Sequence, residues 1–196
     1  MTPDPQDTLS PRERRTLLTL ARAAIADRLV RDGSLDRALV EIELTPALET
    51  PRGVFVTLRE GATDKTKGQL RGCIGSMSPT EPLFRAVIRS ARSSAFDDPR
   101  FDPIVAEQLP KIRLEISALT PLVSVEGPEA IVPGRDGVQL AKDDHRAVFL
   151  PQVATEQGWD TRRLLEGLAL KAGLPRDGWR GARLETFRAE VFGEDA

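Results

Sequence analysis

The chain has 196 residues, with 28 Lys and Arg against 30 Asp and Glu and a formal net charge of −2 at pH 7. This balance, together with 5% aromatic residues and no tyrosine, excludes the basic patch and the stacking platforms typical of nucleic-acid-binding proteins. One cysteine excludes an internal disulfide framework, and no stretch approaches the roughly 20 apolar residues that span a membrane. We therefore expect a soluble, cytoplasmic protein of one domain or two small lobes, with no nucleic-acid or membrane partner.

The first elements are predicted from capping residues. Residues 1–9 are polar and contain proline, which indicates a flexible tail. The stretch Ser10-Pro11-Arg12-Glu13 has the form of a capping box with proline at the first helical position, and apolar residues at helical spacing follow it. A helix over residues 10–32 is predicted, and the proline-containing residues 34–52 are predicted to be a connector.

Two alternating stretches then predict a β-hairpin. Residues 53–59 and 70–76 alternate between the two faces of a strand and are joined by a polar, glycine-containing loop. The second strand carries the only cysteine, Cys73. In an extended strand Arg71 shares a face with Cys73, where a nearby guanidinium favours the thiolate.

Glycines flank this cysteine on both sides. Gly72 and Gly75 remove side-chain bulk, so that another backbone or a ligand can approach closely. Two interpretations stay open from these residues. Cys73 is either a reactive thiol at a bare, electropositive position or a small buried hydrophobe in a tight strand.

A second helix and a proline-rich turn follow. Apolar residues at helical spacing predict a helix that starts after Pro82, and its N-terminus would favour a nearby thiolate. The stretch 97–103 contains two prolines and adjacent carboxylates. Asp98 is therefore a candidate acid, base or metal ligand, although such a cluster more often caps a helix end and pairs with a neighbouring arginine.

Residues 111–119 alternate cleanly and predict a strand with one apolar face. Glu115 lies on the other face. It is a candidate acid or base if that face lines a cleft, and an ordinary solvated side chain if it does not.

The last third predicts a hairpin, a helix and a strand. Residues 138–141 and 147–150 form the hairpin, whose loop holds His145, the only histidine. We expect this histidine to be exposed and do not pair it with Cys73. Asp160 is predicted to cap a third helix that ends at Gly173. Residues 183–192 are predicted to form a last strand, although their spacing also fits a helix.

Familiar cofactor motifs do not occur in the sequence. It has no Walker loop, no dinucleotide-binding fingerprint, no nucleophile elbow and no zinc-type cluster. We expect no metal and no cofactor.

Several stretches, taken together and in order, resemble the AMMECR-domain family, whose bacterial branch is called AmmeMemoRadiSam system protein A. The resemblance covers most of the chain, from about the first helix to about residue 192. The stretches that carry it are Gly53–Leu58, Leu70-Arg71-Gly72-Cys73-Ile74-Gly75, Ala95–Phe101, Leu114–Ser117, Gly134–Gly137, Val148–Ala154 and Lys171–Leu174.

This resemblance implies an α/β (α+β) fold of two unequal, interleaved lobes within residues 10–196, the larger an antiparallel sheet flanked by helices. It implies a site near the Cys73 stretch, in a cleft between the lobes. It also implies two partners, a Memo-like protein and a radical-SAM protein, but no established reaction.

Two hypotheses follow. In the first, the protein is an enzyme or enzyme component that acts on or carries a small molecule at Cys73, with Arg71 lowering the thiol pKa or binding an anionic group. Asp98 and Glu115 are weaker acid–base candidates, and Gly72, Ile74, Gly75 and Arg100 are candidate binding residues. In the second, the protein is a non-catalytic binding or scaffold module for the two partners, and Cys73 only packs.

Overall fold

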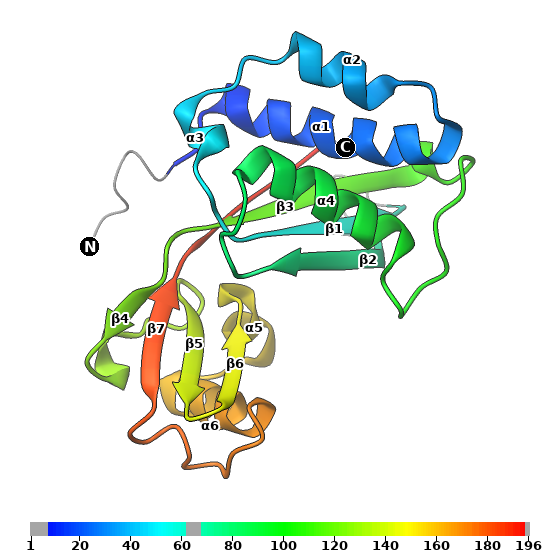
Figure 1. The fold of residues 1–196 in the computed structure, drawn as a ribbon. Coiled ribbons are helices and arrows are strands. Elements are labelled where there is room, and N and C mark those ends of the chain that lie inside the picture. The colour runs from blue at the N-terminus through cyan, green and yellow to red at the C-terminus, as the bar shows by residue number, and fades with distance from the viewer. Residues whose placement is uncertain (1–7, 62–67, 195–196) are drawn as a thin grey trace. The chain divides into compact units, whose positions relative to one another are not determined.

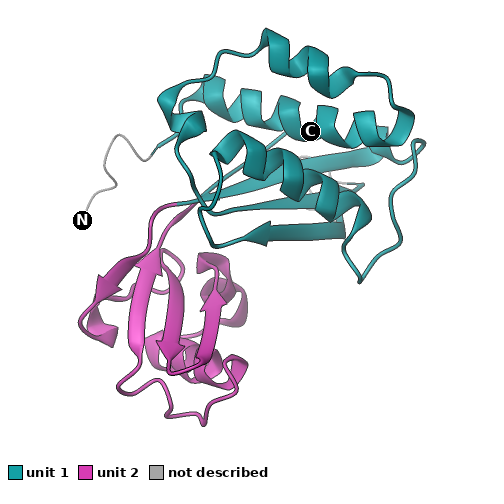
Figure 2. Ribbon diagram, in the orientation of Figure 1, with its two compact units in different colours: residues 1–119, 190–196 teal, residues 120–189 magenta. Residues whose placement is uncertain are grey.

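The structure is a computed structural model that describes residues 8–61 and 68–194. Figure 2 shows its division into two compact units. Unit 1 comprises residues 1–119 and 190–196, and unit 2 is the continuous segment 120–189 that interrupts it.

Unit 1 is built on an antiparallel sheet with strand order β2-β1-β3-β8. Figure 1 shows helices α1 and α4 lying on one face of this sheet, with α2 beside α1. The elements of unit 1 are α1 Pro11–Val30, α2 Ser34–Glu41, α3 Pro46–Glu49, β1 Val54–Glu60, β2 Gln69–Ser76, α4 Leu83–Phe96, β3 Ile112–Leu119 and β8 Ala189–Gly193.

Strand alternation decides which face of this sheet carries the core. Every second residue of β1 and β3 is buried against the helices, and these residues are Val54, Val56, Leu58, Ile112, Leu114, Ile116 and Ala118. The residues between them in β1 and β3 therefore point to the opposite face of the sheet. That opposite face carries Thr57, Glu115 and two arginines described below.

Helix α1 begins as its capping residues predict. The Ser10 hydroxyl accepts a hydrogen bond from the Glu13 amide, and the Glu13 carboxylate accepts one from the Ser10 amide at 2.7 Å. The sequence predicts that the residue before this box, Leu9, belongs to the tail. In the structure it is 1% exposed, and its amide donates to Glu190. Residues 1–7 of that predicted tail lie outside the described residues.

Unit 2 has its own sheet and core. Strand order is β4-β7-β5-β6, and helices α5 and α6 pack on the face that carries Val138, Leu140 and Leu184. The elements are β4 Val123–Val125, β5 Gly137–Lys142, β6 His145–Phe149, α5 Pro151–Gln157, α6 Thr161–Lys171 and β7 Arg183–Phe187. Short 3-10 turns occupy Leu109–Lys111 in unit 1 and Pro128–Ala130 in unit 2.

The predicted α/β fold class is confirmed, and two local predictions are wrong. The connector 34–52 contains α2 and α3, and helix α5 after Leu150 was not predicted. Residues 183–192 form two strands instead of one, because the chain leaves the sheet of unit 2 at Phe187 and enters that of unit 1 at Ala189.

Candidate functional site

Cys73 lies on β2, the edge strand of the unit 1 sheet. Its register partner on β1 is Thr57, and the Thr57 hydroxyl donates a hydrogen bond to the Cys73 Sγ at 3.4 Å. Thr57 is 8% exposed, whereas Cys73 is half-buried. The residue is therefore partly accessible, and its sulfur has a hydroxyl donor of the kind that can stabilise a thiolate.

Arg71 does not occupy the position that simple alternation predicts. Leu58 pairs with Gly72 and Arg59 pairs with Leu70, so that Arg71 is the extra residue of a bulge. Its guanidinium lies near Glu60 at 3.6 Å and donates to the Asp102 carbonyl and the Gln108 side chain at 3.4 Å. Among the described residues, none of these polar contacts of Arg71 is with the Cys73 sulfur, so an action of Arg71 on the thiol stays a prediction.

A different pair, Asp98 and Arg100, holds the backbone of Cys73. The Cys73 amide donates to Asp98 Oδ2 at 2.9 Å, and Arg100 Nη2 donates to the Cys73 carbonyl at 3.3 Å. The backbone amide and carbonyl of Cys73 therefore point away from β1, toward the free edge of the sheet. Asp98 and Arg100 supply the hydrogen-bond partners that a neighbouring strand would otherwise provide there. The Arg100 guanidinium also donates two hydrogen bonds to the Asp98 carboxylate, at 2.7 and 2.9 Å.

These contacts shift the pKa of both partners. Hydrogen bonds from the Arg100 side chain, helped by the Cys73 and Arg100 amides, hold the pKa of Asp98 far below its usual range despite its burial. The pKa of Arg100 is raised, chiefly by the Asp98 side chain and to a smaller extent by the charge of Cys73. Asp98 thus stays ionised, and its oxygens are occupied by protein donors, which removes it as a ready proton carrier.

The glycines of this stretch are explained by the approach of another backbone. A Cβ on Gly72 would lie 2.0 Å from the Ser94 carbonyl oxygen of α4, and one on Gly75 would lie 2.1 Å from the Val54 carbonyl oxygen. Beside them, the Ser94 hydroxyl accepts from the Ile74 amide at 2.8 Å and donates to the Val56 carbonyl at 2.7 Å. Helix α4 therefore packs closely on β2 and is hydrogen-bonded through Ser94 to both β1 and β2.

Glu115 lies on the same face of the sheet as Thr57. It is the register partner of Thr57 on β3, and it is half-buried. The row Cys73, Thr57, Glu115 thus crosses three strands, so that two strand spacings of about 4.8 Å each separate the thiol strand from the carboxylate strand. Glu115 is not in direct contact with the sulfur but faces the same surface.

Other sequence candidates lie elsewhere. The His145 Nδ1 lies 2.8 Å from the Ala172 carbonyl in unit 2, at the end of α6. Within residues 8–61 and 68–194, no three His, Cys, Asp or Glu side chains gather as metal ligands. Over the same residues, no helix is long and apolar enough to cross a membrane.

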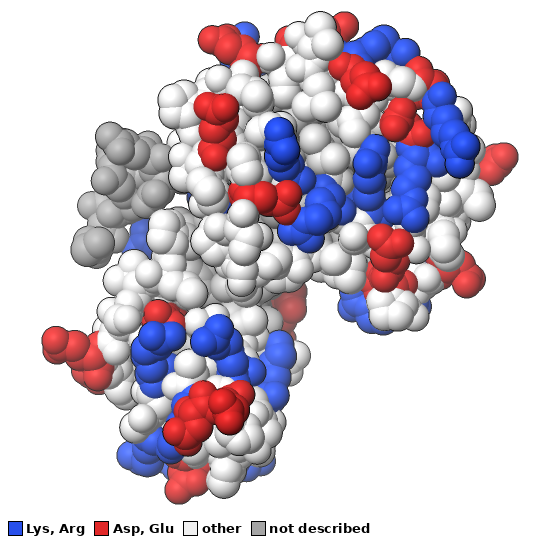
Figure 3. Space-filling view, viewed as in Figure 1, with Lys and Arg blue, Asp and Glu red and all other residues white. Residues whose placement is uncertain are grey.

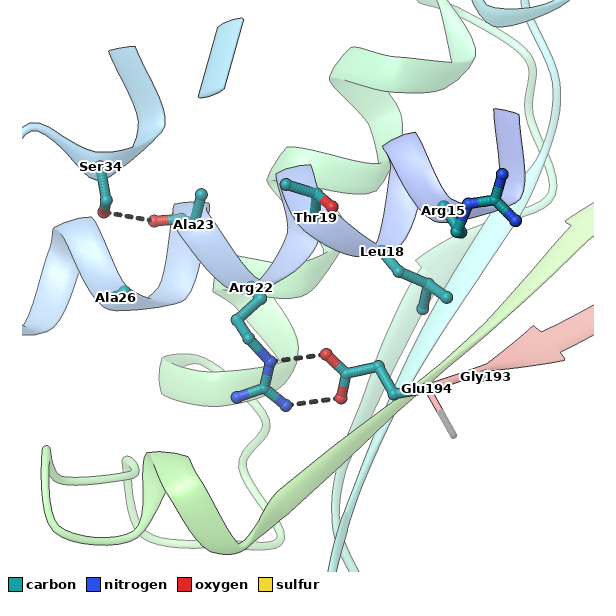
Figure 4. Close-up of a pocket in the computed structure, with 9 residues that line it drawn as sticks. All are labelled: Arg15, Leu18, Thr19, Arg22, Ala23, Ala26, Ser34, Gly193 and Glu194. Carbon is teal, nitrogen blue, oxygen red and sulfur yellow. Dashed lines mark hydrogen bonds and ion pairs between the residues drawn. The ribbon is translucent and has the colours of Figure 1, made fainter. Parts of the chain in front are cut away.

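A separate hollow of about 550 Å³ lies along α1, and Figure 4 shows the side chains around it. Its central polar group, Arg22, forms two 2.5 Å bonds with the Glu194 carboxylate and also donates to the carbonyls of Leu109 and Ile112. The protein itself thus satisfies the Arg22 guanidinium. The remaining lining is Arg15, Leu18, Thr19, Ala23, Ala26, Ser34 and Gly193.

Sequence reasoning missed two residues of the Cys73 site. Thr57 could have been found by aligning the two strands of the predicted hairpin, since it is the direct partner of Cys73. Ser94 gave no signal, because a serine inside a helical pattern is ordinarily a solvated or core residue.

These observations define a two-unit α/β protein with a single thiol on a capped edge strand. The AMMECR1 family model matches residues 18–192, and the chain belongs to this family. A protein of Methanothermobacter thermautotrophicus is 42% identical over 195 residues, covering 95% of this chain and 97% of its own length. Protein PF1979 of Pyrococcus furiosus is 39% identical over 186 residues, covering 91% of this chain and 87% of its own length. The crystal structure of uncharacterized protein PH0010 from Pyrococcus horikoshii has the same fold, with a TM-score of 0.74, 40% identity, and coverage of 91% of this chain and 89% of that chain.

Proposed function

We propose that the protein is an enzyme or enzyme component that uses Cys73 as a nucleophilic thiol. The observation that carries the proposal is the environment of the sulfur. Cys73 is half-buried, its sulfur accepts a hydrogen bond from the Thr57 hydroxyl, and its amide and carbonyl are held by Asp98 and Arg100. A hydroxyl donor and a nearby cation favour the thiolate, which is the nucleophilic form.

The role of each residue follows from its contacts. Thr57 supplies a hydrogen bond to the sulfur, and Arg100 supplies positive charge on the side of the free edge. Asp98 is a positioning residue, because it holds the Cys73 amide and orients the Arg100 guanidinium. Arg71 supports the neighbouring segment through Asp102 and Gln108 instead of the sulfur.

The test is the rate at which iodoacetamide alkylates the protein at pH 7. The chain has one cysteine, so the label reports Cys73 alone. We expect Cys73 to react at least about fivefold faster than N-acetylcysteine, because the Thr57 hydroxyl donates to its sulfur and the Arg100 guanidinium binds its carbonyl. Thr57→Val and Arg100→Gln should each slow the reaction, and Arg100→Lys should restore part of the rate because it keeps the charge.

A non-catalytic docking role is the alternative. It is favoured by Asp98, whose oxygens are occupied by the protein's own donors and leave no ready proton carrier beside the thiol. The partners would then be the Memo-like and radical-SAM proteins. A Cys73→Ala protein that keeps full function in cells, together with an alkylation rate no faster than that of N-acetylcysteine, supports this alternative and contradicts the first.

A further inference from the structure

Two arginines face each other on the surface that carries the Cys73 row. Arg59 on β1 is the register partner of Arg113 on β3. Each is next to a buried core residue, Leu58 and Leu114 respectively, so both side chains project from the face opposite to the helices. That is the face of Thr57 and Glu115. Both arginines are half-buried.

Like charges in direct cross-strand register are unfavourable, because their Cβ atoms lie only about 5 Å apart. Over residues 8–61 and 68–194, neither Arg59 nor Arg113 forms an ion pair with a carboxylate, Glu115 included. Within the described part of the chain, this pair therefore leaves positive charge uncompensated on a partly buried surface, where water screens it less than on an exposed helix.

The helical surface of unit 1 shows the contrast. Figure 3 shows basic side chains gathered over that surface with acidic ones between them. Three arginines of α1 and α4 form ion pairs, Arg28 with Asp97, Arg89 with Glu81 and Arg92 with Asp27. Ion pairing is thus common on that surface. Among the described residues, Arg59 and Arg113 form no such pair.

The two arginines lie within reach of the thiol. Arg59 is two residues along β1 from Thr57, a rise of about 7 Å, and Thr57 contacts the Cys73 sulfur. Arginine side chains are long enough to bridge such diagonal positions on a sheet. An anionic group bound by both guanidiniums would therefore hold the rest of its molecule near Cys73.

We propose that Arg59 and Arg113 form an oxyanion-binding site, and that the molecule acting at Cys73 carries a phosphate or a carboxylate. Two guanidiniums side by side match the oxygens of either group and can bind them bidentately. This inference rests on the proposed function for the role of Cys73, whereas the binding of the anion is independent of it.

The first test is thermal unfolding in inorganic phosphate or succinate, compared with sodium chloride at the same ionic strength. Specific binding to the folded state raises the melting temperature. We expect a rise for the wild type, its loss in the double variant R59Q/R113Q, and its retention in R85Q/R89Q, which removes two arginines from α4. A rise with phosphate alone or with succinate alone identifies the anion. No rise with either, or an equal rise in R59Q/R113Q, overturns the proposal.

The second test compares alkylation of Cys73 by anionic iodoacetate and neutral iodoacetamide at one pH. The rate with iodoacetate divided by the rate with iodoacetamide does not depend on the intrinsic reactivity of the thiol. This ratio therefore measures anion binding separately from the proposed role of Cys73 as a nucleophile. We expect R59Q/R113Q to lower this ratio roughly three- to tenfold, with no change in R85Q/R89Q. Should the double variant fail to fold, the single variants Arg59→Gln and Arg113→Gln are expected to lower it partially. An unchanged ratio in the folded variants contradicts the proposal.

Discussion

Asp98 shows how one buried residue can determine the geometry of a site. Its side chain is 2% exposed and accepts hydrogen bonds from the Cys73 amide, the Arg100 amide and two nitrogens of the Arg100 guanidinium. Such charge-assisted bonds are stronger than neutral ones. The carboxylate thus links the turn after α4 to the edge strand at the residue that carries the thiol.

Asp98→Asn is expected to lower the free energy of unfolding by about 1–3 kcal/mol, because it removes the charge from this network while keeping the side-chain size. The neighbouring Asp97→Asn is a matched control. Asp97 is 52% exposed and pairs with Arg28 only at 3.5 Å, so its loss should change the free energy by less than about 0.5 kcal/mol. Urea denaturation of both variants measures the difference, and equal values would show that the Asp98 network adds no stability.

The same substitution should change the acid stability of the protein. Because the folded state lowers the pKa of Asp98, the unfolded state binds its proton more readily. The stabilisation is therefore complete above the ordinary aspartate range, near pH 4, and is lost as pH falls below it. Between about pH 4 and pH 2, the free energy of unfolding should fall more steeply in the wild type than in Asp98→Asn. Parallel curves would contradict this linkage.

At the scale of elements, the contact of α4 with β2 depends on a residue without a side chain. Gly72→Ala would put a Cβ 2.0 Å from the Ser94 carbonyl oxygen, and this backbone atom can move only if the helix moves. We expect a loss of about 2–3 kcal/mol in unfolding free energy, as for other overpacked positions. Gly181→Ala is the comparison: its Cβ meets open space at a φ of +71°, so only the backbone cost of about 1 kcal/mol applies. Similar losses in the two variants would show that α4 adapts to the added methyl group.

Elements with strong local signals were predictable from the sequence. The capping box at Ser10, the alternation in β1, β2 and β3, and the Asp160 cap of α6 all correspond to the structure. The missed helices α2 and α5 are short, and neither has a side-chain N-cap: Gly33 and Leu150 occupy those positions. Their stability comes from packing on longer elements, which a local pattern does not reveal.

The site was predictable only in part, for a similar reason. Alternation correctly placed Glu115 away from the core, and the glycine-flanked Cys73 was visible from the start. The bulge at Arg71 arises from the pairing of two strands, and the Asp98–Cys73 bond joins residues 25 positions apart. No local pattern in the sequence contains either fact.

At the scale of the molecule, unit 2 is an insertion between two neighbouring strands of the unit 1 sheet, β3 and β8. Its two ends are tied together, since the Thr120 amide donates to the Arg188 carbonyl and the Arg188 amide donates to the Thr120 hydroxyl, each at 2.9 Å. Segments whose ends lie this close can be replaced with little strain on the remaining fold. The chain thus permits a direct test of which unit forms the site.

In that test, residues 121–187 are replaced by Asn-Gly, a two-residue turn that suits an antiparallel hairpin. The contacts described for Cys73 come from Thr57, Asp98 and Arg100, which all belong to unit 1. We therefore expect the shortened protein to fold and to react with iodoacetamide within about twofold of the full chain at pH 7. A full chain with the Arg188→Ala substitution controls for damage at the junction. If the shortened protein keeps its circular dichroism but its thiol reacts at the rate of N-acetylcysteine, then unit 2 is needed to activate Cys73 and the site extends beyond the sheet of unit 1.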